Sequence, residues 1–81
     1  MSKTDWSSRV DPVVERYRNL VPVMGLEEAT LAMSAVARMI VAVERARAAR
    51  SNGSVALAED AIVQAGKLLE AVGDKGRPEE P

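Results

Sequence analysis

Four arginines lie close together near the middle of the chain, and their side chains are the best suited to bind a ligand. They are Arg38, Arg45, Arg47 and Arg50. Guanidinium groups bind phosphate oxygens well, so the cluster could contact nucleic acid or an acidic partner. The same residues also suit the end of a helix, because the helix dipole favours cations there. We expect mainly a structural role, with anion or partner contact as the alternative.

Arg38 differs from the other three because it stands among apolar residues, away from any expected helix end. We expect it either to lie on a narrow exposed stripe with Thr30 and Ser34, or to pair across an interface with a carboxylate such as Glu70.

Half of the twelve acidic residues occur as neighbouring pairs, at 27–28, 59–60 and 79–80, and the chain has no histidine or cysteine. Adjacent side chains on a helix diverge by about 100°, so a pair cannot converge on one metal ion. We therefore expect no metal, no cofactor and no catalytic residue, and interpret the protein as a non-enzyme. A site built between subunits from Arg, Glu, Ser and Tyr is the remaining enzymatic alternative.

Trp6 and Tyr17 are the only aromatic residues. A tryptophan near a polar chain end could anchor a partner, because such residues often dominate binding energy. The alternative, which we favour, is that Trp6 packs back on the protein as a lid. Met24, Met33 and Met39 could form an adaptable binding surface, but we expect them to fill the core.

Composition restricts the classes of protein further. The chain has 81 residues and a net charge of −1, so it forms one domain and no global field attracts nucleic acid or membrane. The most apolar stretch, residues 29–43, is shorter than the ~20 residues that a membrane span needs. The first residues resemble no signal peptide. We expect a cytoplasmic protein with no membrane contact, and keep nucleic acid only as an alternative partner.

Three helices are predicted, over residues 12–21, 26–50 and 55–72. Asp11 and Pro12 suit the start of the first, and Pro22 ends it. Residues 51–54 end the second, since Asn and Gly readily adopt the left-handed conformation. Ser54 is then expected to cap the third helix, and Gly73 to close it.

The predicted domain covers residues 11–73 and is all-α. Residues 1–10 are expected to form a flexible arm. Residues 74–81, rich in Gly, Pro and charge, are expected to form a disordered tail.

Both long helices carry apolar residues at alternating steps of three and four, which predicts that they pack together. Because the loop between them is short, they must form an antiparallel hairpin. The expected contact residues of the second helix are Leu26, Ala29, Met33, Val36, Ile40, Val43 and Arg47. Those of the third are Val55, Ala58, Ile62, Ala65, Leu69 and Val72.

The second helix is apolar around most of its circumference, so one hairpin partner and a short first helix cannot cover it. The hairpin is therefore predicted to pair with a second copy into a dimeric four-helix bundle, a homo-oligomer with one surface used twice. The expected interface residues are Met33, Val36, Met39, Ile40, Val43, Ile62 and Leu69. A different protein partner could supply the missing surface instead.

These features favour a non-enzymatic protein–protein interaction module, such as an adaptor, an inhibitor, a chaperone-like protein or an assembly factor. The alternative is a nucleic-acid-associated protein that uses the arginine-rich end of the second helix.

Overall fold

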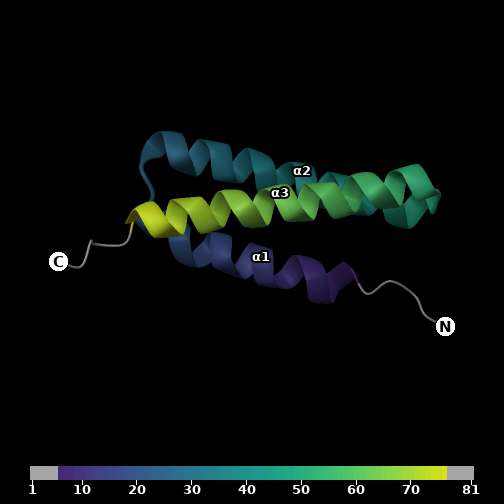
Figure 1. Ribbon diagram of the computed structural model, residues 1–81, viewed down its shortest axis with the longest axis horizontal. Coiled ribbons are helices and arrows are strands. Elements are labelled where there is room, and N and C mark those ends of the chain that lie inside the picture. Colours follow the sequence, from purple (N-terminus) through teal and green to yellow (C-terminus); the bar gives the residue numbers. More distant parts are fainter. Residues whose placement is uncertain (1–5, 77–81) are drawn as a thin grey trace.

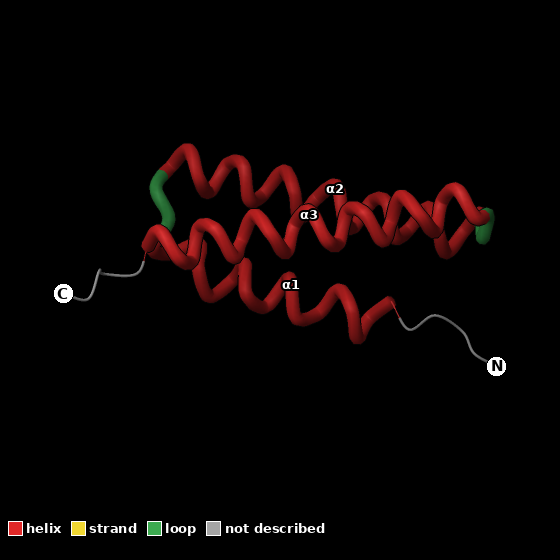
Figure 2. Tube along the Cα trace, viewed as in Figure 1, coloured by secondary structure: helices red, strands yellow, loops and turns green. Residues whose placement is uncertain are grey.

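The computed structural model describes residues 6–76, with side chains for residues 6–73. It consists of α1 (Trp6–Leu20), a short 3-10 helix η1 (Val21–Val23), α2 (Leu26–Ala49) and α3 (Asn52–Gly76). No strand occurs in this part of the chain, so the predicted all-α class is confirmed. α2 and α3 form an antiparallel hairpin, and α1 lies along it in the same direction as α3 (Figure 1). Short loops at opposite ends join the helices (Figure 2).

All three helices contribute apolar side chains to one core. Trp6 enters from α1, and Val10, Val13, Val14 and Tyr17 pack beside it. The hairpin supplies the remaining buried members of this cluster, Val36, Met39, Val43, Ala46, Ala58, Ile62 and Ala65. α1 is therefore a third layer of packing on the hairpin.

α1 begins earlier than predicted. It starts at Trp6, so Pro12 lies inside the helix and residues 6–10 are helical rather than part of an arm. A proline inside a helix costs about 3 kcal/mol. Trp6 and Val10 continue the stripe of Val13 and Tyr17, and burying ~150–250 Å² of tryptophan surface at ~25 cal/mol per Å² offsets that cost. Residues 1–5 of the predicted arm lie outside the described part.

α2 is rotated relative to the predicted register, so that of its predicted contact residues only Val36 and Val43 are buried. Its buried residues are Ala32, Val36, Met39, Val43 and Ala46. Met33 and Ile40, expected in the seam, are 55% and 44% exposed. The register prediction was wrong because α2 is apolar almost all round, and alternating three- and four-residue steps also fit the neighbouring stripe.

α3 buries the residues that its pattern predicts. Ala58, Ile62, Ala65, Leu69 and Val72 are buried, and Val55 is half-buried. The helix does not close at Gly73 but continues to Gly76. Gly73 does not adopt the left-handed conformation that ends helices, and a Cβ atom at this position would lie at an ordinary 3.7 Å from Leu20 Cδ1. Residues 77–81 of the predicted tail lie outside the described range.

The turn between α2 and α3 is tighter than expected. Arg50 adopts the left-handed conformation, with φ 55° and ψ 25°, and its N–H donates to the Ala46 carbonyl. The Ser51 hydroxyl accepts a hydrogen bond from the Ser54 N–H at 3.1 Å. Ser51 is therefore the N-terminal cap of α3, and the prediction that Ser54 fills that role was wrong. Asn52 and Gly53 belong to the first turn of α3.

Candidate interaction surface

Five of the seven predicted interface residues lie inside the chain. Val36, Met39, Val43, Ile62 and Leu69 are buried by α1, α2 and α3 of the same molecule. In this fold at most 8% of the surface of any of them is left for contact with a second chain. Only Met33 and Ile40 are exposed, because the α2 register places them outside the core.

Polar groups are not gathered into a buried site. Among the side chains of residues 6–73, none that is buried is polar or charged. The described residues hold no group of three acidic side chains that could bind a metal ion. Glu59 instead forms an ion pair with Arg9 at 3.4 Å, and Glu28 accepts a hydrogen bond from the Gly25 N–H at 3.3 Å. These carboxylates therefore connect or cap helices. Glu79 and Glu80 lie beyond the described residues.

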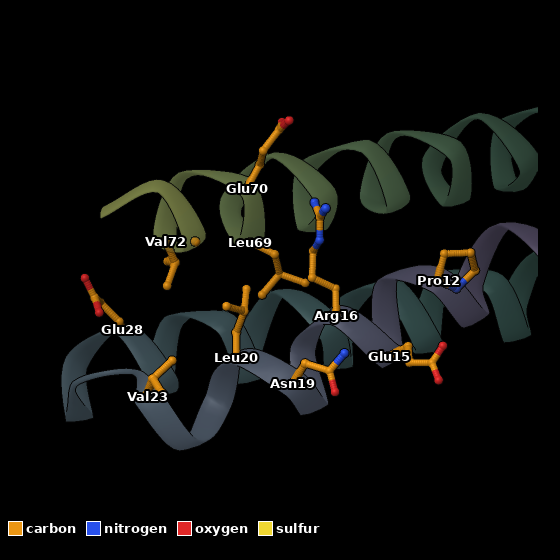
Figure 3. A pocket seen from close by; sticks show the side chains of 11 residues that line it. Pro12, Glu15, Arg16, Asn19, Leu20, Val23, Glu28, Leu69, Glu70 and Val72 are labelled. Atoms are coloured by element: carbon orange, nitrogen blue, oxygen red, sulfur yellow. The ribbon is translucent and has the colours of Figure 1, made fainter. Parts of the chain in front are cut away.

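A wide depression of about 760 Å³ lies between the second half of α1, the start of α2 and the last turns of α3. Leu20 and Leu69 line it, and Arg16 rises from α1 toward α3 (Figure 3). Glu70 points away from α1 in the same view. The Glu70 carboxylate therefore does not turn back toward the Arg16 guanidinium in this view.

The four arginines are divided between different surfaces. Arg38 and Arg45 line a groove between α2 and α3. Arg47 lies 4.0 Å from Glu44 on the same helix and lines a small depression beside Ser7 and Asp11. Arg50 occupies the turn. Arg45, Arg47 and Arg50, at the end of α2, therefore do not form one basic patch. Arg38 and Glu70 also lie on different surfaces of the chain.

Trp6 is 7% exposed and belongs to the core, so it acts as the lid that the sequence allowed. The Arg9 guanidinium lies 5.6 Å from the centre of its ring, a cation–π distance. Tyr17 is half-buried against the same core. Neither aromatic side chain is displayed as a free anchor. Met39 fills the core as expected, whereas Met24 is half-buried.

The groove that contains Arg38 and Arg45 is the most distinctive surface; we call it the α2–α3 groove. It encloses about 290 Å³ and is lined only by α2 and α3. Its members share a flank of the hairpin that α1 does not reach: Ala35, Arg38, Val41, Ala42, Arg45, Leu57, Asp60, Ala61 and Gln64. α1 meets the other flank of α3, where Arg9 binds Glu59.

Small and large side chains are separated in this groove. Ala35, Ala42 and Ala61 are half-buried, whereas Val41 and Leu57 are 50% and 66% exposed. Sequence reasoning did not single out this combination. A signal was present, because Ala35 and Ala42 are seven residues apart, as are Arg38 and Arg45, which places each pair on one flank of α2.

A second exposed apolar surface runs along α2, and we call it the α2 stripe. It consists of Leu26, Met33 and Ile40. Its members are spaced by seven residues and therefore share one side of the helix. Ile40 lies next to α1, in the depression that Ser7 and Val10 also line. The stripe is thus separate from the α2–α3 groove.

Comparisons with protein-family models, with curated proteins and with solved structures found no match to this chain. None of the helices described here has the length and hydropathy that crossing a bilayer requires.

Proposed function

We propose that the protein is a small non-enzymatic interaction module that acts as a helical homodimer in the cytoplasm. The observation that carries this proposal is the α2–α3 groove, where exposed apolar side chains surround a floor of alanines. In the proposed assembly the two hairpins form a four-helix bundle, and each α1 covers the outer side of its own hairpin. Adaptor, inhibitor, chaperone-like and assembly roles all fit such a module.

Apolar exposure supports association. Single exposed apolar side chains are common on soluble proteins and need no explanation. Here Val41 and Leu57 share one groove, and fully burying such a side chain contributes about 1.5–3 kcal/mol. A two-fold dimer buries each of them twice, which gives association a substantial driving force.

The distribution of charge favours this proposal over a nucleic-acid-associated role. Binding to a phosphate backbone needs several cations on one surface. Arg47 is close to Glu44, and Arg38 and Arg45 share their groove with Asp60. Arg38, Arg45 and Arg47 therefore have acidic neighbours that weaken their field.

Sedimentation equilibrium at micromolar concentration tests the proposal. We expect a mass twice the 8.7 kDa of the chain, falling toward the monomer value on dilution. A folded monomer that persists at high micromolar concentration would contradict the homodimer. Circular dichroism on the same samples establishes that the chain is helical in either case.

A further inference from the structure

We propose that a second copy of this chain occupies the α2–α3 groove, with Arg38 and Arg45 of each copy flanking Asp60 of the other. This inference rests on the proposed homodimer and assigns its contact face. Shape, charge pattern and symmetry each support it.

The shape of the groove suits a helical partner. Its floor consists of the short side chains Ala35, Ala42 and Ala61, and its sides carry Val41 and Leu57. Small residues let a second helix approach closely, while the larger side chains fill the space beside it. Val41 and Leu57 of one copy can therefore enter the space above the alanines of the other.

The charged residues of the groove are complementary to those of the same groove in a second copy. The α2 side carries two cations, Arg38 and Arg45, and the α3 side carries the anion Asp60. Arg38 and Arg45 are two helical turns apart, or about 10 Å along the axis. Asp60 lines the same stretch of groove. A partner that presents an α3 surface to α2 thus brings a carboxylate between two guanidinium groups, where charge-assisted hydrogen bonds are strong.

Two-fold symmetry makes this contact twice. A two-fold axis parallel to the helices places α2 of one copy over α3 of the other, and α3 over α2. This rotation does not shift either copy along the helix axes. Residues of α2 and α3 that lie at the same height in one groove therefore face each other across the interface. The same surface of each copy therefore forms both sides of the interface, as a closed two-fold dimer requires.

The α2 stripe lacks this complementarity. Leu26, Met33 and Ile40 provide apolar area only. The charged residues that share a depression with Ile40 are Asp11, Glu44 and Arg47, and the last two lie 4.0 Å apart on the same helix. Anions and a cation are thus mixed beside the α2 stripe, whereas the α2–α3 groove has its cations on one helix and its anion on the other.

A charge-exchange experiment tests the assignment. One variant carries Asp60→Arg, and the other carries Arg38→Asp and Arg45→Asp. In either homodimer, like charges meet twice, so we expect dimerisation to weaken at least tenfold. In a one-to-one mixture, one contact keeps the native pairing of Arg38 and Arg45 with Asp60. In the other contact the signs are exchanged, so opposite charges meet again. We therefore expect the mixture to form a heterodimer, detected by native mass spectrometry and sedimentation.

Matched controls carry the same changes in net charge on α1, where Glu15, Arg16 and Arg18 are exposed. They are Glu15→Arg and the double change Arg16→Asp with Arg18→Asp, and both should dimerise like the unaltered chain. If circular dichroism shows that a groove variant has lost its helices, Asp60→Lys and the pair Arg38→Glu with Arg45→Glu replace it.

The outcomes separate the two proposals. A monomeric unaltered chain overturns the homodimer itself. An unaltered dimer whose groove variants remain dimeric overturns only the groove assignment, and loss of dimers on changing Met33 and Ile40 to Asp would then place the interface on the α2 stripe. Weakened variants that do not associate when mixed also overturn the pairing of Arg38 and Arg45 with Asp60.

Discussion

The two sides of the α2–α3 hairpin differ in what covers them. On one side α1 brings Trp6, Val10 and Tyr17 into contact with the core. On the other side, the α2–α3 groove has an alanine floor and exposed Val41 and Leu57. Large side chains from the same chain close the first side, and nothing in residues 6–73 fills the second.

The difference shows that apolar content alone does not tell which surface of a helix is satisfied. Both sides contain apolar side chains, but only the side that meets α1 has a neighbouring helix with bulky residues. Charge differs in the same way. On the covered side Arg9 and Glu59 pair within the chain at 3.4 Å, whereas the groove keeps two cations and one anion on opposite sides.

The covered side depends most on Trp6. Trp6→Ala removes the largest side chain that α1 places in the core, so we expect the free energy of unfolding to fall by about 3–5 kcal/mol. Urea unfolding followed by circular dichroism measures this. As a control, Ser7→Ala changes an exposed neighbour and should have an effect within about 0.5 kcal/mol. A loss below 1 kcal/mol for Trp6→Ala would mean that α1 does not close this side.

The open side should depend on apolar association rather than on folding. Leu57→Asp puts a charge into the groove, and we expect the dimer dissociation constant to rise at least tenfold, because the interface would bury an unpaired carboxylate. Sedimentation velocity over a dilution series measures the constant. Val63→Asp is the matched control, since Val63 is exposed on α3 but does not line the groove. Equal effects of the two changes would remove the distinction between the sides.

The turn that joins the two hairpin helices offers a smaller test. Arg50 has φ 55°, a conformation that costs an ordinary residue about 1–2 kcal/mol and glycine little. Because glycine also loses more chain entropy on folding, we expect Arg50→Gly to raise the free energy of unfolding by about 0.5–1 kcal/mol. The midpoint of thermal unfolding at a fixed protein concentration reports it. A lower midpoint would indicate that the Arg50 side chain has a contact of its own.

The ion pair on the covered side should have the smallest effect. Arg9 and Glu59 are both exposed, so a double-mutant cycle with Arg9→Ala and Glu59→Ala should give a coupling of about 0.2–1 kcal/mol that declines in salt. Arg9→Ala also removes the contact of the Arg9 guanidinium with the Trp6 ring. This loss is the same with and without Glu59, so it cancels in the coupling energy. A coupling above 2 kcal/mol would show that this pair helps to close the side as strongly as an apolar side chain.

The sequence predicted which segments are helical better than it predicted which side of each helix faces the core. The register of α3 was predicted correctly, because the residues at alternating steps of three and four from Ala58 to Val72 are buried, although Leu57 and Val63 between them are exposed. The register of α2 was not, because its apolar residues surround it and only the tertiary packing selects Met39 over Ile40. Local rules also misplaced two ends. Pro12 was predicted to start α1, but the helix begins at Trp6. Asn52 and Gly53 were predicted to end α2, but Arg50 is the left-handed residue that ends it.

Less of the candidate surface could be predicted. The arginines were recognised, but their separation follows from angles around α2: Arg38 and Arg45 are seven residues apart, whereas Arg47 is two further on and faces another direction. Asp60 became relevant only when the hairpin register placed it in the same groove. A contact between two helices depends on that register, which apolar periodicity in α2 left ambiguous.

Thiol labelling at a single position tests the central claim most directly, because the unaltered chain contains no cysteine. Gln64→Cys places a thiol on the α2–α3 groove, and Met33→Cys places one on the α2 stripe. We expect labelling of the groove thiol to slow as protein concentration rises, while the stripe thiol reacts at a constant rate. A groove thiol whose labelling rate is independent of concentration, in a chain that sediments as a dimer, would contradict the account.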